Sequence, residues 1–208
     1  RQLLLAGTTT GSILILDLEK KEEIKILQYH TAPIFDIKYS LKTNCFYTAS
    51  GDGHFSVCSL DTLSLLQIKK LTKEKIRNID FNYTNSEIAV ALGDRKVLVF
   101  ELHTLNHKTD FIAHQSAVYV VRYSPDGKMV AIGYSSGIVN VYNNSPFEWK
   151  FSIKAHAQTI YSLEFHPTGR YIVTTSKDGT LKVWDLELKK DIRTINAAAG
   201  QSFSTSAP

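Results

Sequence analysis

The sequence of 208 residues is poor in cysteine and proline and contains no long hydrophobic run. Its two cysteines, Cys45 and Cys58, are too few for a disulfide framework and fit a reducing compartment, so we expect an intracellular, cytoplasmic protein. Five prolines and eleven glycines exclude a collagen-like chain or a flexible linker. No stretch approaches the roughly 18 apolar residues of a membrane-spanning helix, so we expect no membrane partner.

A strong excess of charge is also absent, because 24 basic residues against 20 acidic ones leave a net charge of +4. That balance is too weak to indicate nucleic-acid binding by itself. The hydrophobic content of 43% is typical of a chain that buries a core without a metal or disulfide. The sequence opens on Arg1 and has no signal-like segment, so we expect a trimmed or fragmentary sequence.

What the sequence does contain is an internal repeat of 42 residues. Turn-forming pairs recur at this spacing without insertion or deletion, and the residues after each turn match as well. The pairs are Thr10-Gly11, Asp52-Gly53, Asp94-Arg95, Ser136-Gly137 and Asp178-Gly179. One supersecondary unit is therefore predicted to occur about five times.

Each unit is predicted to contain four short strands. In the last full unit, residues 160–165, 171–176 and 180–186 alternate in hydrophobicity and are rich in β-branched residues, and 191–195 form a weaker fourth strand. Gly, Asp and Asn residues separate the strands. No segment shows a convincing helical pattern of apolar residues, so the fold class is predicted to be all-β.

The predicted hairpins also separate the two cysteines. A turn near residues 51–53 places Thr48 across from Cys58. Side chains alternate between the two faces of a strand, so Cys45 then points to the opposite face. We therefore expect no disulfide between the two cysteines.

The last unit resembles a WD repeat, through A-H at 155–156, S-K-D-G-T at 176–180 and V-W-D-L at 183–186. WD-repeat proteins form β-propellers, in which four-stranded blades surround a channel. The resemblance implies a propeller with about five blades in this chain, either closed or, as we favour, part of a longer one. We predict a single domain or fragment over residues 1–196, with 197–208 as a tail or a strand that closes the first blade.

The resemblance further implies a buried hydrogen-bond set in the last unit, formed by His156, Thr174, Asp178 and Trp184. Asp178 would accept from the ring of His156, and Thr174 would link to the indole N–H. In residue types the set is similar to a catalytic triad. It is expected inside a blade, however, with no nucleophile beside a cleft. A structural role is therefore favoured.

The other units depart from this set. The third unit keeps only its Asp94, and the fourth keeps only His114. The second unit has Cys58 in place of Trp but keeps His30, Thr48 and Asp52. Apolar packing is therefore expected to hold most blades together.

One position near the start of each first strand carries a large side chain. The residues, spaced 42 apart, are Phe35, Arg77, Tyr119 and Tyr161. First strands line the channel of a propeller, so these side chains should meet at one rim, where they suit a protein partner. The alternative is that they fill a narrow channel.

Residues 69–77, K-K-L-T-K-E-K-I-R, form a basic loop that is expected on the same face. Lys70, Lys73 and Lys75 could dock an acidic segment or phosphates. A solvated basic loop is the alternative, and it is favoured.

The patterns together predict a non-catalytic protein–protein interaction scaffold in a multiprotein assembly, with partners, acidic ones among them, on the channel-rim face. A small-ligand or enzymatic site at the channel mouth is the alternative, although the rim positions offer aromatics and one arginine instead of convergent acids, bases or metal ligands. Nucleic-acid binding is a weaker alternative. We predict no catalytic residue, metal or cofactor.

Overall fold

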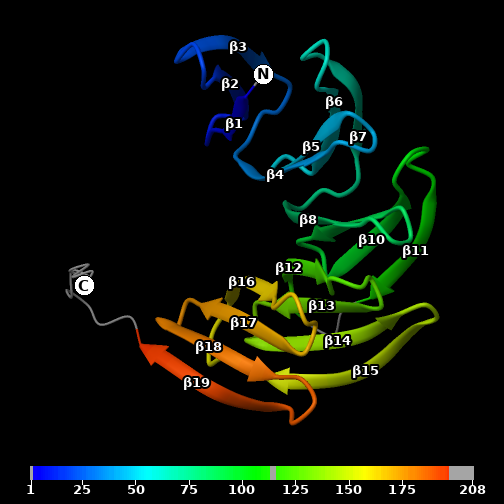
Figure 1. Cartoon of the computed structure of the whole chain (residues 1–208), viewed down its shortest axis with the longest axis vertical. Helices are drawn as coiled ribbons and strands as arrows, with labels where there is room; N and C mark the ends of the chain where they lie inside the picture. Colours follow the sequence, from blue (N-terminus) through cyan, green and yellow to red (C-terminus); the bar gives the residue numbers. More distant parts are fainter. Residues whose placement is uncertain (1, 113–115, 197–208) are drawn as a thin grey trace.

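The computed structural model describes residues 2–112 and 116–196, which form 19 β-strands and no helix. The strands make five antiparallel sheets, each built from consecutive strands and here numbered blades 1 to 5 (Figure 1). The all-β prediction is confirmed. Residues 197–208, predicted as a tail or closing strand, and His114 lie outside the described residues.

Blade 1 has three strands, and each of the other blades has four. Blade 1 contains β1 (Leu3–Gly7), β2 (Ser12–Asp17) and β3 (Glu22–Gln28). Blade 2 contains β4 (Ile34–Ser40), β5 (Cys45–Ser50), β6 (His54–Ser59) and β7 (Leu65–Lys70). Blade 3 contains β8 (Ile76–Asn82), β9 (Glu87–Leu92), β10 (Lys96–Glu101) and β11 (His107–Ile112).

The last two blades follow the same plan. Blade 4 contains β12 (Val118–Tyr123), β13 (Met129–Tyr134), β14 (Ile138–Asn144) and β15 (Phe147–Lys154). Blade 5 contains β16 (Ile160–Phe165), β17 (Tyr171–Ser176), β18 (Thr180–Asp185) and β19 (Lys190–Asn196). The first two strands of blade 5 span the predicted residues, and the third ends one residue earlier than predicted.

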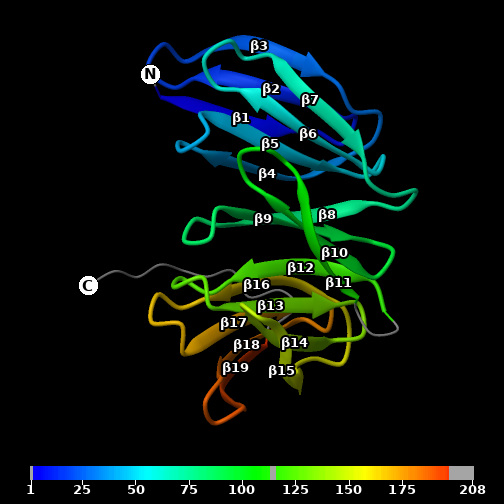
Figure 2. The same ribbon diagram turned by 90° about the vertical axis from the view of Figure 1, so that its right-hand side faces the viewer.

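The blades follow an arc with blade 1 and blade 5 at its ends, and the side view shows them stacked along the long axis (Figures 1 and 2). The first strands of blades 2 to 5, which are β4, β8, β12 and β16, lie on the inside of the arc. Successive inner strands contact one another, as β12 does with both β8 and β16. These inner strands carry the residues predicted to form the rim.

Apolar side chains pack between successive blades and form the core. Val139 and Val141 of blade 4, for example, share a buried cluster with Ile172 and Trp184 of blade 5. Similar clusters join each of the other neighbouring blades. Among the described residues, no helix is long and apolar enough to cross a bilayer.

The hairpin between β5 and β6 corrects one predicted register. Its turn is centred on Asp52, with Gly53 at a φ of 78°, so Thr48 pairs with Ser56 and not with Cys58. The left-handed glycine tightens the turn and shifts the pairing by two residues, which leaves each side chain on its expected face. Cys45 and Cys58 are free, buried thiols in different hydrophobic clusters.

Candidate functional site

Four large side chains from neighbouring inner strands form a continuous row, which we call the rim row: Phe35, Arg77, Tyr119 and Tyr161. The guanidinium carbon of Arg77 lies 5.4 Å from the ring centre of Phe35 and 3.9 Å from that of Tyr119. The rings of Tyr119 and Tyr161 follow, with their centres 6.2 Å apart. The structure thus brings all four predicted rim residues together.

The backbone explains why this position repeats. In blades 2 to 5 the pairing of the first and second strands shifts register at the rim residue. The shift lies between Ile34 and Asp36 in blade 2 and at the equivalent residues of the other three blades. A bulged residue lacks a direct partner on the neighbouring strand, and the bulge redirects its side chain. Four bulges in equivalent places therefore present four side chains to the same side of the arc.

The rim row is only partly covered by the rest of the protein. Phe35 is 41% exposed and Tyr161 is 55% exposed, whereas Arg77 and Tyr119 are half-buried. Large apolar side chains at this exposure remain available for contact with another molecule.

The predicted basic loop lies beside the row. Lys75 places its ammonium nitrogen 5.9 Å from the ring centre of Phe35. The loop backbone is anchored at Leu71, whose N–H donates to Gly53 O at 3.0 Å, and at Lys75, whose carbonyl accepts from Gly93 N at 2.7 Å. Lys70, Lys73 and Lys75 are all exposed, and none forms an ion pair with a carboxylate of the described residues.

A second group of polar residues is buried at the turn between the second and third strands of blade 5. The Nδ1 atom of His156 lies 3.1 Å from Asp178 Oδ2, and its Nε2 atom lies 2.7 Å from Thr174 Oγ1. The indole N–H of Trp184 donates to the same Thr174 oxygen at 3.1 Å. This geometry fits a neutral imidazole that donates from Nδ1 to the carboxylate and accepts from the threonine hydroxyl at Nε2.

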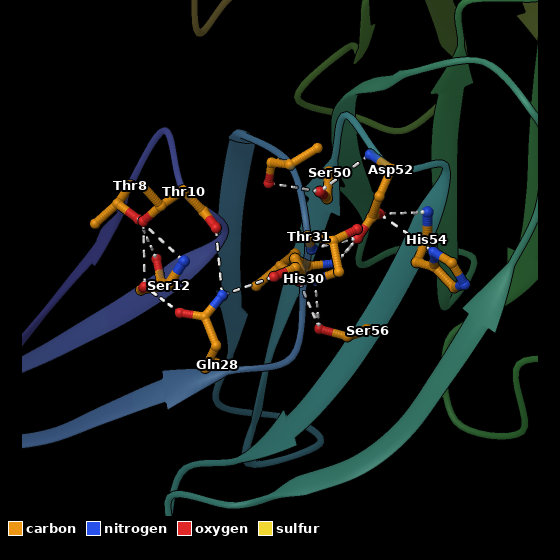
Figure 3. Close-up of polar contacts among 12 residues, drawn as sticks. Thr8, Thr10, Ser12, Gln28, His30, Thr31, Ser50, Asp52, His54 and Ser56 are labelled. Carbon is orange, nitrogen blue, oxygen red and sulfur yellow. Dashed lines mark hydrogen bonds and ion pairs between the residues drawn. The ribbon is translucent and has the colours of Figure 1, made fainter.

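Blade 2 builds a related network without tryptophan (Figure 3). His30 Nδ1 lies 3.2 Å from Asp52 Oδ2, and His30 Nε2 lies 2.7 Å from Thr48 Oγ1. Ser56 Oγ, at 2.5 Å from Thr48 Oγ1, completes the set. Sequence reasoning identified the missing tryptophan but not Ser56, which the corrected pairing places directly across from Thr48.

Burial and hydrogen bonding move the pKa values of these groups in a consistent way. Burial lowers the pKa of His30 and of His156, although the neighbouring aspartate opposes the shift in each case. Burial alone would raise the pKa of Asp52, but hydrogen bonds from the N–H groups of Thr31 and His54 outweigh it and lower the pKa to about 2. The pKa of Asp178 is lowered as well, by hydrogen bonds from Thr180 and Ala157 that outweigh its burial. At neutral pH each pair is therefore a neutral histidine with an ionised aspartate.

Part of this sequence matches a model of a known protein family. The family model described as "WD domain, G-beta repeat" matches residues 105–143 and 147–185, which cover most of blade 4, the outer strand of blade 3 and most of blade 5. The 42-residue period carries the same unit through the other blades. The chain contains WD repeats.

Curated relatives of this WD-repeat chain include three differently named proteins. It is 26% identical over 149 residues to mouse (Mus musculus) "Guanine nucleotide-binding protein subunit beta-like protein 1", an alignment that covers 70% of this chain and 45% of the relative. It is 23% identical over 161 residues to the Caenorhabditis elegans "Periodic tryptophan protein 2 homolog", and the alignment covers 76% of this chain and 18% of the relative. It is 30% identical over 142 residues to human (Homo sapiens) "Echinoderm microtubule-associated protein-like 3", and the alignment covers 68% of this chain and 16% of the relative. The chain thus spans less than half the length of each of these relatives.

Sequence reasoning missed a row of charges farther along the inner strands of these WD repeats. At one position, 42 residues apart, the sign alternates through Lys38, Asp80, Arg122 and Glu164. Lys38 Nζ lies 3.8 Å from Asp80, and Arg122 Nε lies 2.7 Å from Glu164. Burial raises the pKa of Asp80, and Arg122 opposes that shift. The 42-residue spacing, read for charge as it was for aromatics, would have revealed these residues.

Asn78 and Asp36 extend this connection between blades. The side-chain amide of Asn78 donates to Asp36 at 2.6 Å, and its oxygen accepts from Arg122 Nη1 at 2.6 Å. Inner strands of different blades do not share a β-ladder, so these side chains supply polar links between them. Within the described ranges, no group of three or more His, Cys, Asp or Glu side chains could hold a metal ion.

Proposed function

We propose that this WD-repeat protein is a non-catalytic scaffold that docks a partner protein on the rim row. The observation that carries the proposal is the row of contacts from Phe35 through Arg77 and Tyr119 to Tyr161 across four blades, with about half of each end residue exposed. Aromatic and arginine side chains are enriched among the residues that dominate binding energy at protein interfaces.

The comparisons support a protein partner. WD-repeat relatives suggest a protein–protein interaction scaffold as the general role. One relative's name refers to association with microtubules, which are themselves protein assemblies. The histidine–aspartate networks also fit a scaffold, because each connects a turn and two strands of one blade. The hydroxyl groups beside the histidines, on Thr48, Ser56 and Thr174, are fully buried inside the blades, where no substrate reaches them.

Substitution of the tyrosines tests the rim row against a role in channel filling. A partner is first identified by affinity capture with the intact chain and mass spectrometry. Tyr119→Ala and Tyr161→Ala should each weaken its binding at least tenfold, or about 1.4 kcal/mol, while melting like the parent. The matched control is Tyr39→Ala, because Tyr39 lies on β4 outside the row and is 61% exposed. If the rim variants melt early but bind normally once corrected for the folded fraction, the row is structural and the proposal fails.

The basic loop supports an acidic partner for the same face. Reversing Lys70, Lys73 and Lys75 to Glu should leave folding intact, since all three side chains are exposed. Association should become slower, because electrostatic steering by the loop is lost. Stopped-flow measurement at low salt checks this, and an unchanged association rate assigns the loop to plain solvation.

A further inference from the structure

The guanidinium of Arg77 is held in place by rings rather than by hydrogen bonds. It lies between Phe35 and Tyr119, with its central carbon 5.4 and 3.9 Å from the two ring centres. Its Nε atom is buried and has no hydrogen-bond partner, and no ion pair joins the side chain to any of the described residues. A guanidinium carries five N–H donors, so Arg77 has donors available for a ligand.

Arg122, one strand further along, shows that this condition is particular to Arg77. Arg122 donates to Glu164 at 2.7 Å, to Asn78 at 2.6 Å and to the carbonyl of Val121 at 2.8 Å. Both arginines lie on the inner strands, yet only Arg122 is satisfied within the described part of the chain. The terminal nitrogens of the half-buried Arg77 side chain form no hydrogen bond to the described residues, so their N–H groups are the donors that a ligand from another molecule can reach.

The ring faces of Phe35 and Tyr119 are already occupied, and this indicates the sign of the charge that a ligand should carry. An aromatic row alone would suit an incoming cation, because ring faces attract positive charge. Here Arg77 already takes that place between Phe35 and Tyr119, and Lys75 lies 5.9 Å from the Phe35 ring. A second cation would be repelled. The edge of the guanidinium remains, and its planar fork matches a carboxylate.

We propose that Arg77 is an anion-binding residue that receives the carboxylate of an acidic segment of the partner protein. The inference rests on the proposed docking function of the rim row and names the chemistry of its ligand. Charge complementarity selects the occupant, since Lys73 and Lys75 are exposed on the adjoining loop and free of ion pairs to the described carboxylates. Acidic side chains of one extended segment would reach Arg77 and these lysines together.

Binding of charged peptides to the full chain tests the proposal. The probes are fluorescein-labelled 12-residue peptides that alternate glycine with Glu, Gln or Lys, measured by fluorescence anisotropy at low salt. The Glu peptide should bind and the Gln and Lys peptides should not. Arg77→Gln should weaken binding of the Glu peptide about tenfold or more, because one charge-assisted fork is lost. Arg193→Gln, the same change at an exposed residue of β19, should leave it unchanged.

The variant Arg77→Lys distinguishes the effect of bidentate hydrogen bonding by the guanidinium from the effect of its positive charge. Lysine keeps the charge but cannot bind a carboxylate in two places, so its affinity should fall between those of the parent and Arg77→Gln. It also decides the question if Arg77→Gln melts early. Equal binding of the Glu peptide by the parent and a well-folded Arg77 variant overturns the proposal. A preference for the Lys peptide, no binding of the Glu peptide, or binding only of a phosphoserine counterpart overturns it too.

The captured partner distinguishes this inference from the proposed function. If Tyr161→Ala loses the partner while Arg77→Gln keeps it, the rim row docks a protein but Arg77 is no anion receptor. If both variants keep the partner, the docking function itself fails.

Discussion

Blades 2 and 5 differ from blades 3 and 4 in what lies beneath the turn between their second and third strands. Blades 2 and 5 bury a histidine between an aspartate and a threonine. In blade 3, the one described donor to Asp94 is Thr72 Oγ1, at 2.9 Å, and the buried Oδ1 atom of Asp94 has no partner among the described residues. In blade 4, Ser136 takes the aspartate position and bonds Ser116 at 3.0 Å. The same backbone unit therefore forms with or without the polar network.

Blades 3 and 4 instead share a polar cluster at the opposite end of the blade. Glu87, at the start of β9, accepts from the amides of Asn82 at 3.3 Å and Asn144 at 3.1 Å. Lys108 lies 2.6 Å from its other oxygen. This cluster crosses from one blade to the next, whereas each histidine network stays within its own blade. Apolar packing holds every blade pair, and polar groups are added in different places.

The largest expected effect is at the one tryptophan of these networks. Trp184→Ala should destabilise the protein by roughly 3–5 kcal/mol, because it removes a large buried side chain and the donor to Thr174. The matched change in blade 2, Cys58→Ala, should cost about 1 kcal/mol, because it removes only a sulfur atom from the buried interior. Urea unfolding measures both. Equal losses would mean that the tryptophan network adds nothing to blade 5.

A smaller difference in stability is expected between substitutions of Asp178 in blade 5, which has the histidine network, and of Asp94 in blade 3, which lacks it. Asp178→Ala should cost on the order of 1–3 kcal/mol, since it leaves the buried His156 donor and two backbone N–H groups without their acceptor. Asp94→Ala should cost less than about 1 kcal/mol, because among the described residues a single threonine hydroxyl donates to Asp94 and its buried Oδ1 atom has no hydrogen bond to lose. Denaturant melts of the pair, with the slope checked for two-state behaviour, decide the comparison. A larger loss at Asp94 would reverse it.

Most of the fold could be predicted because the period of the sequence is also the period of the structure. The strands of blade 5 follow from alternation and turn residues, and the three-stranded make-up of blade 1 within the described residues agrees with the 42-residue register. The pairing of Thr48 could not be obtained in this way. It depends on how the residues of the turn share their φ angles, which the sequence pattern of the strands does not specify.

The rim row shows which part of the site could be predicted. Its four residues share one register position, so their common direction could be inferred from spacing. The stacking of Arg77 between two rings could not, because it depends on the bulges that redirect these side chains. Ser56 was missed for another reason: only the true pairing shows that a short serine opposite Thr48 substitutes for a long indole two residues further along.

The smallest effect expected concerns pH, and it again distinguishes blade 2 from blade 3. Burial lowers the pKa of His30 below its ordinary value of 6.5, so near and below pH 6.5 the unfolded chain binds more protons than the folded one. The contribution of His30 to the free energy of unfolding is therefore fully present above pH 6.5 and is lost as the pH falls towards the lowered pKa. Asp52 acts in a separate window, because its contribution is present above its ordinary pKa of 3.8 and is lost as the pH falls towards about 2.

Between pH 8 and pH 5.5 the expected loss thus comes from His30 and His156, whose pKa values are both lowered by burial. His30→Gln should flatten the dependence of the unfolding free energy on pH by removing the contribution of blade 2. His103→Gln, an exposed loop change in blade 3, should leave the slope of the parent. Urea melts at half-unit pH steps give the slopes. If His30→Gln and the parent lose stability in parallel, His30 does not take up a proton on unfolding in this range, and the neutral-histidine assignment in blade 2 is wrong.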